Sequence, residues 1–298
     1  MACTATSDET KLTLKHLLSA LRRFPPEILR EIFLLCIPKN AGPCALSQVC
    51  GYWRAVALSI PQLWCKIDIV LTRPSSESNN VCSLIRLFLQ RSGNLPLFVG
   101  VVCREGDWTS HPALDMLMEA SDRWRDALLY LPSSLFPRLA RIKGRLGSLR
   151  TLEMYPLQLN HDTEENMIID AFQRAPLLNV VRTFETGVTF LIPSEQLTTH
   201  RSTPHDLSLL SDGLHHMRNL VICHIETSED FEFLPPTQIN LPNLHTLRIT
   251  TKMSADPGAL AALLDAFIVP KLAELRIRSR QRAVSHLITL DLRSSCSL

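Results

Sequence analysis

The stretch LPNLHTLRI, residues 241–249, carries the pattern that decides most of the fold. Its apolar residues are Leu241, Leu244, Leu247 and Ile249. Successive members of this set are separated by two, two and one intervening residues. The alternation at the end is typical of a short β-strand with one buried side. One strand cannot bury that side alone, so the pattern predicts further strands that stack against it.

The same pattern recurs through the second half of the chain. Full copies begin at Leu146, Met217, Leu241, Val269 and Val284, and shorter versions begin at Ala175 and Ser194. The central leucines of the first six copies are separated by roughly 19–29 residues, the period of leucine-rich repeats. The last step, to Leu287, is about 15 residues and too short for a full repeat. We therefore predict an irregular leucine-rich-repeat-like α/β solenoid over residues 146–298.

Helical material is expected between some of these strands, over residues 164–173 and 257–267. The chain closes with Ser294–Leu298 directly after a strand-like pattern, although a solenoid normally ends in a polar cap. We expect either that the cap is missing or that the chain is shortened at this end.

Residues 66–145 are predicted to connect the N-terminal part to the repeats and to begin the solenoid. Breaker-rich residues 72–80 indicate a loop, and the apolar spacing over residues 81–89 predicts a helix. Residues 97–103 are strand-like, and residues 113–121 are expected to form a second helix. These elements and the repeats together predict an α+β chain.

The stretch FPPEILREIFLLCIP, residues 24–38, predicts a helix near the N-terminus. Its two prolines suit a first helical turn, and Pro38 ends the pattern. Ile28, Ile32 and Leu35 form one apolar row, and Leu29, Phe33 and Cys36 form the row beside it. The combined stripe is too wide for a simple surface helix.

A second helical pattern runs from Leu46 to Ala57, and a short segment with Leu63 and Trp64 follows it. Gly51 interrupts this pattern, and because glycine costs about 1 kcal/mol in a helix interior, we expect a break there. A module of this size buries little of its own surface, so its remaining apolar stripe needs cover from the rest of the chain or from a partner.

The patterns PPEILxxIF, LSxVCxxWR and PxLW together resemble an F-box, and in particular the F-box proteins abundant in mushroom-forming fungi. The chain departs from the family at Phe24, where leucine is usual, and at Gly51-Tyr52, where basic residues are common. The resemblance implies domains at 1–20 (an extension), 21–65 (the F-box), 66–145 and 146–298. It also implies binding to a Skp-type adaptor, which links to cullin and RING subunits. The residues it implies for adaptor binding are Pro25, Pro26, Glu27, Ile28, Leu29, Ile32, Phe33, Leu46, Val49, Cys50, Trp53 and Trp64.

The function expected from this resemblance is that of a substrate receptor in a cullin-RING ubiquitin ligase, with an unknown target protein bound by the repeats. The alternative is a repeat scaffold whose degenerate F-box has no ligase role. No catalytic residue, metal or cofactor is expected, because the sequence contains no GxSxG, HExxH, GxGxxG or P-loop motif. His215-His216 lacks the further ligands that zinc requires.

Charge and composition narrow the choice of partners further. Lys and Arg number 31 against 29 Asp and Glu, which gives no broad footprint for nucleic acid or an anionic membrane. The 9 cysteines form no CxxC pair and are interpreted as reduced, small apolar residues. With no signal peptide recognised in the sequence, we expect a cytoplasmic or nuclear protein.

One charged segment stands out near the end of the repeats. Arg276, Arg278, Arg280 and Arg282 alternate, so one side of a strand would carry four guanidinium groups. A solvated sheet edge is one explanation. The other is a ligand face, with Arg276, Arg278 and Arg280 contacting an acidic or phosphorylated ligand.

Overall fold

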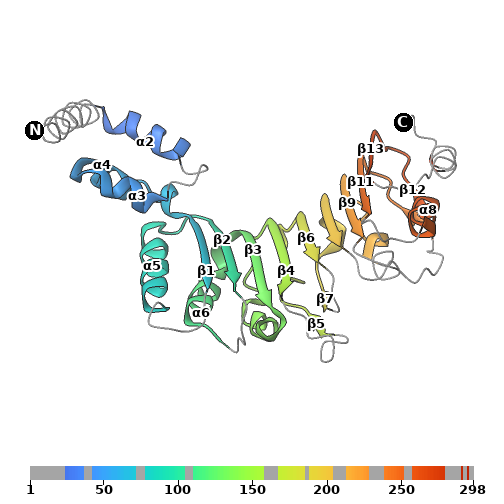
Figure 1. Cartoon of the computed structure of the whole chain (residues 1–298), viewed down its shortest axis with the longest axis horizontal. Helices are drawn as coiled ribbons and strands as arrows, with labels where there is room; N and C mark the ends of the chain where they lie inside the picture. The colour runs from blue at the N-terminus through green and yellow to red at the C-terminus, as the bar shows by residue number, and fades with distance from the viewer. Residues whose placement is uncertain are drawn as a thin grey trace, which may run out of the picture. The chain divides into compact units, whose positions relative to one another are not determined.

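The computed structural model of the chain describes residues 24–36, 42–71, 78–104, 110–157, 167–184, 188–203, 213–227, 238–251 and 257–278, together with Leu290 and Ser294. The chain is a mixed α/β protein with a large parallel sheet and several helices (Figure 1). It divides into two compact units. One comprises Met1–Ile67 and Arg86–Leu95, and the other comprises Asp68–Ile85 and Pro96–Leu298.

The N-terminal unit contains the helices predicted from its apolar spacing. They are α2 (Pro26–Cys36), α3 (Pro43–Val49), α4 (Gly51–Leu58) and the 3-10 helix η2 (Pro61–Trp64). The predicted break in the second helical pattern is confirmed one residue early. Cys50 is extended, with φ −160° and ψ 170°, and Gly51 is the first residue of α4.

Aromatic side chains fill the core of this unit. The Phe33 ring lies 5.0 Å from the Trp53 ring, and the Trp64 ring lies 5.2 Å from Phe88, measured between centroids. The indole Nε1 of Trp64 donates a hydrogen bond of 3.0 Å to the carbonyl oxygen of Ala57. This bond satisfies the polar end of a side chain that is otherwise buried.

The remaining elements alternate between strands and short helices. They are β1 (Lys66–Leu71), α5 (Ser78–Arg91), β2 (Leu97–Cys103), α6 (Pro112–Glu119), η3 (Ser121–Arg123), β3 (Trp124–Pro132), η4 (Ser133–Ile142), β4 (Thr151–Leu157), β5 (Met167–Ile169), β6 (Val180–Phe184), β7 (Val188–Phe190), η5 (Ser194–Gln196), β8 (Thr199–Thr203), β9 (Ile222–Thr227), β10 (Ile239–Asn240), β11 (Thr246–Thr251), α8 (Pro257–Ala266), β12 (Phe267–Ile268) and β13 (Glu274–Arg278).

Within the described residues, nine strands form one sheet in the order β1-β2-β3-β4-β6-β8-β9-β11-β13. Every neighbouring pair from β2 to β13 is parallel. Strands therefore lie side by side in chain order, as Figure 1 shows by its colour sequence. Two further parallel pairs, β5 with β7 and β10 with β12, form small separate sheets.

Each copy of the sequence pattern forms the same local structure. The backbone N–H of its central leucine donates to the carbonyl of the residue three positions earlier, over 3.1–3.3 Å, in all six copies from Leu149 to Leu272. The chain then enters a strand two residues later. In the copy at residues 241–249, Leu241, Leu244, Leu247 and Ile249 are all buried. The pattern thus encodes a turn followed by a half-buried strand.

A side-chain ladder connects neighbouring copies just before the strands. The amide nitrogen of Asn219 donates to the carbonyl of Glu195 over 2.8 Å, and that of Asn243 donates to Arg218 over 3.1 Å. Gln196, at the equivalent position, donates to Ala175 and Leu178. The residue preceding the central leucine therefore holds one turn to the previous one.

Several local predictions are confirmed and three are wrong. The helices expected at residues 81–89, 113–121 and 257–267 are present as α5, α6 and α8, and the strand at 97–103 is β2. The loop expected up to residue 80 ends earlier, because α5 begins at Ser78. The helix expected over 164–173 is replaced, where it is described, by strand β5 and a turn. Met167–Ile169 pairs with β7, and its two isoleucines favour a strand over a helix.

The third error concerns the last copy of the pattern. Leu290 is buried in helical backbone and not in a strand. The rest of that copy and most of residues 279–298 lie outside the described residues, as does the charged segment's Arg280. The short spacing that preceded Leu287 is in keeping with a change of local structure here.

Candidate binding surfaces

No chemical centre is evident in the described part of the chain. No group of three or more histidine, cysteine, aspartate or glutamate side chains is placed to hold a metal ion there. Within the same residues, no helix is long and apolar enough to cross a membrane. Two surfaces remain, one on α2 and one on the large sheet.

Helix α2 buries one of its two apolar rows and exposes the other. Leu29 and Phe33 are 1% and 0% exposed and belong to the core of the N-terminal unit. Ile28 is 48% exposed, Ile32 is 37% exposed and Leu35 is 73% exposed. These three side chains recur at helical spacing, so they form a continuous apolar row on the outer side of the helix, called the α2 row below.

The other residues expected to bind an adaptor divide in the same way. Pro25, Pro26, Glu27 and Val49 are exposed, Cys50 and Trp53 are partly buried, and Leu46 and Trp64 are buried. The buried members pack inside the unit and can support a docking surface without touching a partner. Sequence spacing alone did not separate the two rows, because both recur every three or four residues.

The second surface is the half-buried side of the large sheet. In each copy of the pattern, the fourth and sixth residues after the central leucine point to this side, called the strand face below. The parallel register places the fourth residues in one line across six strands. That line is Glu153, Arg182, Arg201, His224, Arg248 and Arg276.

Carboxylates on the strand face hold most of these arginines. Arg182 Nη1 lies 2.7 Å from Glu153, and Arg201 Nη2 lies 3.0 Å from Glu226. Arg248 and Arg276 both approach the same oxygen of Glu274, Arg248 at 3.9 Å. Since the arginine side chains are 40% to 67% exposed, we expect these pairs to fix side-chain geometry more than to add stability.

The charged surroundings act on His224, which lies in the middle of the line. Its pKa is lowered, first by partial burial and then by the positive charges of Arg201, Arg248 and Arg182, while Glu226 opposes the shift. Partial burial, and after it the positive local field, therefore both favour the neutral imidazole. A bound anion would counter that field.

Three aromatic side chains form a ladder at the other end of the strand face. Tyr130 and Tyr155 stack with centroids 4.2 Å apart and planes 9° apart, and Phe184 lies 5.1 Å from Tyr155. Burial, followed by the nearby Glu153 and Tyr130, raises the pKa of Tyr155 to about 12. Its phenol therefore stays a neutral hydrogen-bonding group at any physiological pH.

The sequence alone predicted only part of the strand face. It predicted that Arg276 and Arg278 share one side of a strand, and both are exposed on β13. It missed the arginines on earlier strands and the aromatic ladder, because these residues are separated by about 20–30 positions. Numbering each copy from its central leucine would have aligned the arginines, Tyr155 and Phe184, since they occupy the fourth or sixth place, whereas Tyr130 lies on β3, before the first copy.

The opposite side of the sheet contains one unusual residue. His200 occupies a place where neighbouring copies have Val181 and Cys223, and it is 3% exposed. Burial lowers the pKa of His200 to about 4, and its Nδ1 has no hydrogen-bond partner in the described residues. Its depth in the core makes it a structural residue rather than part of a binding surface.

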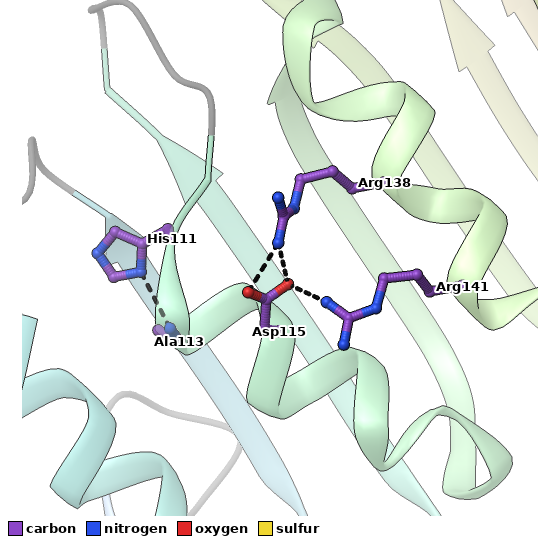
Figure 2. A network of polar contacts seen from close by, with 5 residues as sticks. All are labelled: His111, Ala113, Asp115, Arg138 and Arg141. Atoms are coloured by element: carbon purple, nitrogen blue, oxygen red, sulfur yellow. Dashed lines mark hydrogen bonds and ion pairs between the residues drawn. The ribbon is translucent and has the colours of Figure 1, made fainter.

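The densest polar cluster, on α6 and η4, is also structural. Figure 2 shows Asp115 between Arg138 and Arg141, with Asp115 oxygens 2.7–2.8 Å from Arg138 and 2.5 Å from Arg141. In the same view, His111 Nδ1 accepts the backbone N–H of Ala113 at 3.1 Å and caps α6. Through these contacts the cluster clamps α6 to η4.

Comparison with known protein families and with curated proteins found no match to this chain. The function proposed below is therefore based on the chain's own residues and surfaces.

Proposed function

We propose that this chain is the substrate-receptor subunit of a cullin-RING ubiquitin ligase. In this proposal residues 21–65 are an F-box that binds a Skp-type adaptor, and residues 146–298 are irregular leucine-rich repeats that bind the target protein. The observation that carries the proposal is the exposed apolar α2 row of Ile28, Ile32 and Leu35, within the segment whose sequence resembles an F-box.

An exposed apolar row of this kind is costly for a protein that acts alone. Burying each isoleucine fully contributes about 2 kcal/mol, and roughly half of that contribution is unused when the side chain stays partly exposed. Within the N-terminal unit, Leu29 and Phe33 are buried and the α2 row is not. A partner that covers the row would recover this contribution, which supports the adaptor-binding alternative.

The mechanism in this proposal is proximity, and the chain performs no covalent step. The adaptor connects the F-box to the cullin and RING subunits, and the repeats hold the target. A lysine of the target is then brought near the charged conjugating enzyme, which raises its effective concentration. No titratable group of the chain needs to exchange a proton for this role.

The proposal is tested by co-expressing the full chain with a Skp-type adaptor and measuring co-purification. The variant Ile28→Asp with Ile32→Asp should reduce capture by about tenfold or more, because it places two carboxylates in an apolar contact. Phe33 is left unchanged, since a charge at this fully buried position would unfold the unit.

A matched control is available on the large sheet unit. Ile168 and Leu177 are 63% and 47% exposed, and Ile168→Asp with Leu177→Asp makes the same chemical change there. This control should retain capture. Capture of the α2 variant at the level of the unmodified chain, with both variants folded by circular dichroism, would show that the α2 row does not bind the adaptor.

A further inference from the structure

Three arginines and a single carboxylate lie at the β11–β13 end of the strand face. Arg248 and Arg276 are partners in the register of these strands, and both approach Glu274. Arg278 lies two residues beyond Arg276 on the same side of β13, is exposed, and has no ion pair within the described residues. The cluster thus carries three positive charges and one negative charge, an excess of two.

The fold itself does not require this excess. The fourth place after the central leucine is half-exposed, so a threonine or serine would suit the strand equally well. Like charges directly opposite on neighbouring strands are destabilising, and Arg248 with Arg276 is such a pair. Arg182 with Arg201 is another. Glu153 and Glu226 offset the Arg182–Arg201 pair, whereas Glu274 alone serves both Arg248 and Arg276, so the unbalanced positive charge lies at the β11–β13 end and suits an anionic partner.

The aromatic ladder indicates what kind of partner fits. Tyr130 and Tyr155 cover one face of each other's rings, and the tilted Phe184 ring lies against Tyr155. Tyr155, the middle ring of the ladder, therefore has little free face left for the base stacking that single-stranded nucleic acid uses. An apolar side chain of a peptide can pack against the ring edges.

We propose that the strand face binds an extended phosphopeptide, with its phosphate held by Arg248, Arg276 and Arg278 and an apolar side chain of the same peptide against the aromatic ladder. A phosphate monoester carries a charge of about −2 and three acceptor oxygens, which matches the excess of the cluster. A carboxylate of a peptide carries only one negative charge. The cluster already contains one carboxylate, that of Glu274.

The register also sets the length of the peptide. From Phe184 on β6 to Arg278 on β13 there are four strand steps, through β8, β9 and β11. At about 4.8 Å per step this is roughly 19 Å, or about six residues of extended chain. Binding of the peptide is independent of the F-box, whereas its identification as the ligase target rests on the proposed function.

The probe is a degenerate peptide library with one fixed phosphoserine, passed over the immobilised full chain. Parallel libraries carry serine or glutamate at the fixed position, and an oligouridine of similar length tests nucleic acid. The phosphoserine library should be retained at least about tenfold better than the others. Sequencing of the retained peptides should show an apolar residue about six positions from the phosphoserine.

Variants then locate the site. Arg276→Glu with Arg278→Glu should reduce retention to the level of the serine library. The control Arg174→Glu with Arg218→Glu makes the same charge change at two exposed turn positions outside the strand face and should have no effect. Phe184→Ser should remove the apolar preference and leave the phosphoserine preference.

Three results would overturn the inference: equal retention of the phosphoserine and serine libraries, equal retention of the glutamate library, or stronger binding of oligouridine. Unchanged retention by the double arginine variant would do the same. Adaptor capture is measured on the same protein preparations. Lost capture with intact peptide binding rejects the ligase proposal alone, and lost peptide binding with intact capture rejects this inference alone.

Discussion

The buried imidazole of His200 predicts how the stability of the large unit depends on pH. Its folded-state pKa of about 4 lies below the ordinary value of 6.5 because burial removes water from the charged form. Between these values the unfolded chain binds a proton that the folded chain does not, so the free energy of unfolding falls as pH falls. Above about pH 7 the ring is neutral in both states and contributes no pH dependence.

The size of the effect follows from the same two values. The complete shift corresponds to about 3 kcal/mol, and roughly 2 kcal/mol of stability is lost on lowering the pH from 8 to 5. Exposed charges usually need a reduction for solvent screening, but His200 is 3% exposed. His200→Leu removes the titrating group and fills the same core position between Val181 and Cys223.

The assay is urea denaturation followed by circular dichroism at several pH values from 8 to 5. The difference in unfolding free energy between the unmodified chain and His200→Leu should change by about 2 kcal/mol over this range. Other histidines and carboxylates contribute equally to both proteins and cancel in the difference. Exposed His216 provides a control, since His216→Leu should follow the unmodified chain. Parallel stability curves for His200→Leu and the unmodified chain would refute the reasoning.

Two further substitutions test what stabilises each unit internally. Phe33→Ala removes a fully buried ring and should destabilise the N-terminal unit by about 3–5 kcal/mol, measured from its denaturation midpoint. Leu35→Ala, at an exposed position, is the control. A midpoint shift for Phe33→Ala no larger than that for Leu35→Ala would contradict the assignment of Phe33 to the core. Asn243→Ala removes the hydrogen bond to the carbonyl of Arg218 and the contact with Lys271, and should lower the unfolding free energy by about 1 kcal/mol. An unchanged value would mean that the amide ladder contributes no stability.

Local structure was predictable because its causes are local. A turn with a hydrogen bond over three residues and a strand that alternates every two residues both leave their trace within nine consecutive positions, as residues 241–249 show. Helices α5 and α6 were found in the same way from apolar spacing, and α8 from the proline at its first position. The apolar segment at Met167–Ile169 was too short for periodicity to decide between helix and strand, and pairing with β7 decided it.

Which side of a helix or strand is buried was harder to predict, because burial depends on what packs against that element. Both rows of α2 are apolar, and only contact with the rest of the unit selects Leu29 and Phe33 for the core. His200 breaks the apolar character of a core position, which the aligned copies would have revealed. The lining of the strand face depends on register between distant strands, and no single window of sequence contains it.

The two candidate surfaces share a physical property. Polar residues in place of Ile28 and Ile32 would leave the contacts of Leu29 and Phe33 intact, and small residues in place of the arginines would leave every strand pairing intact. In both places the side chains lower stability or solubility without improving the fold. Residues that conflict with local stability in this way are expected where a protein binds something else. The test uses stabilising substitutions at both surfaces, such as Ile28→Gln and Arg248→Thr. If adaptor capture and phosphopeptide binding stayed unchanged, the inference that these locally unfavourable side chains serve binding would be wrong.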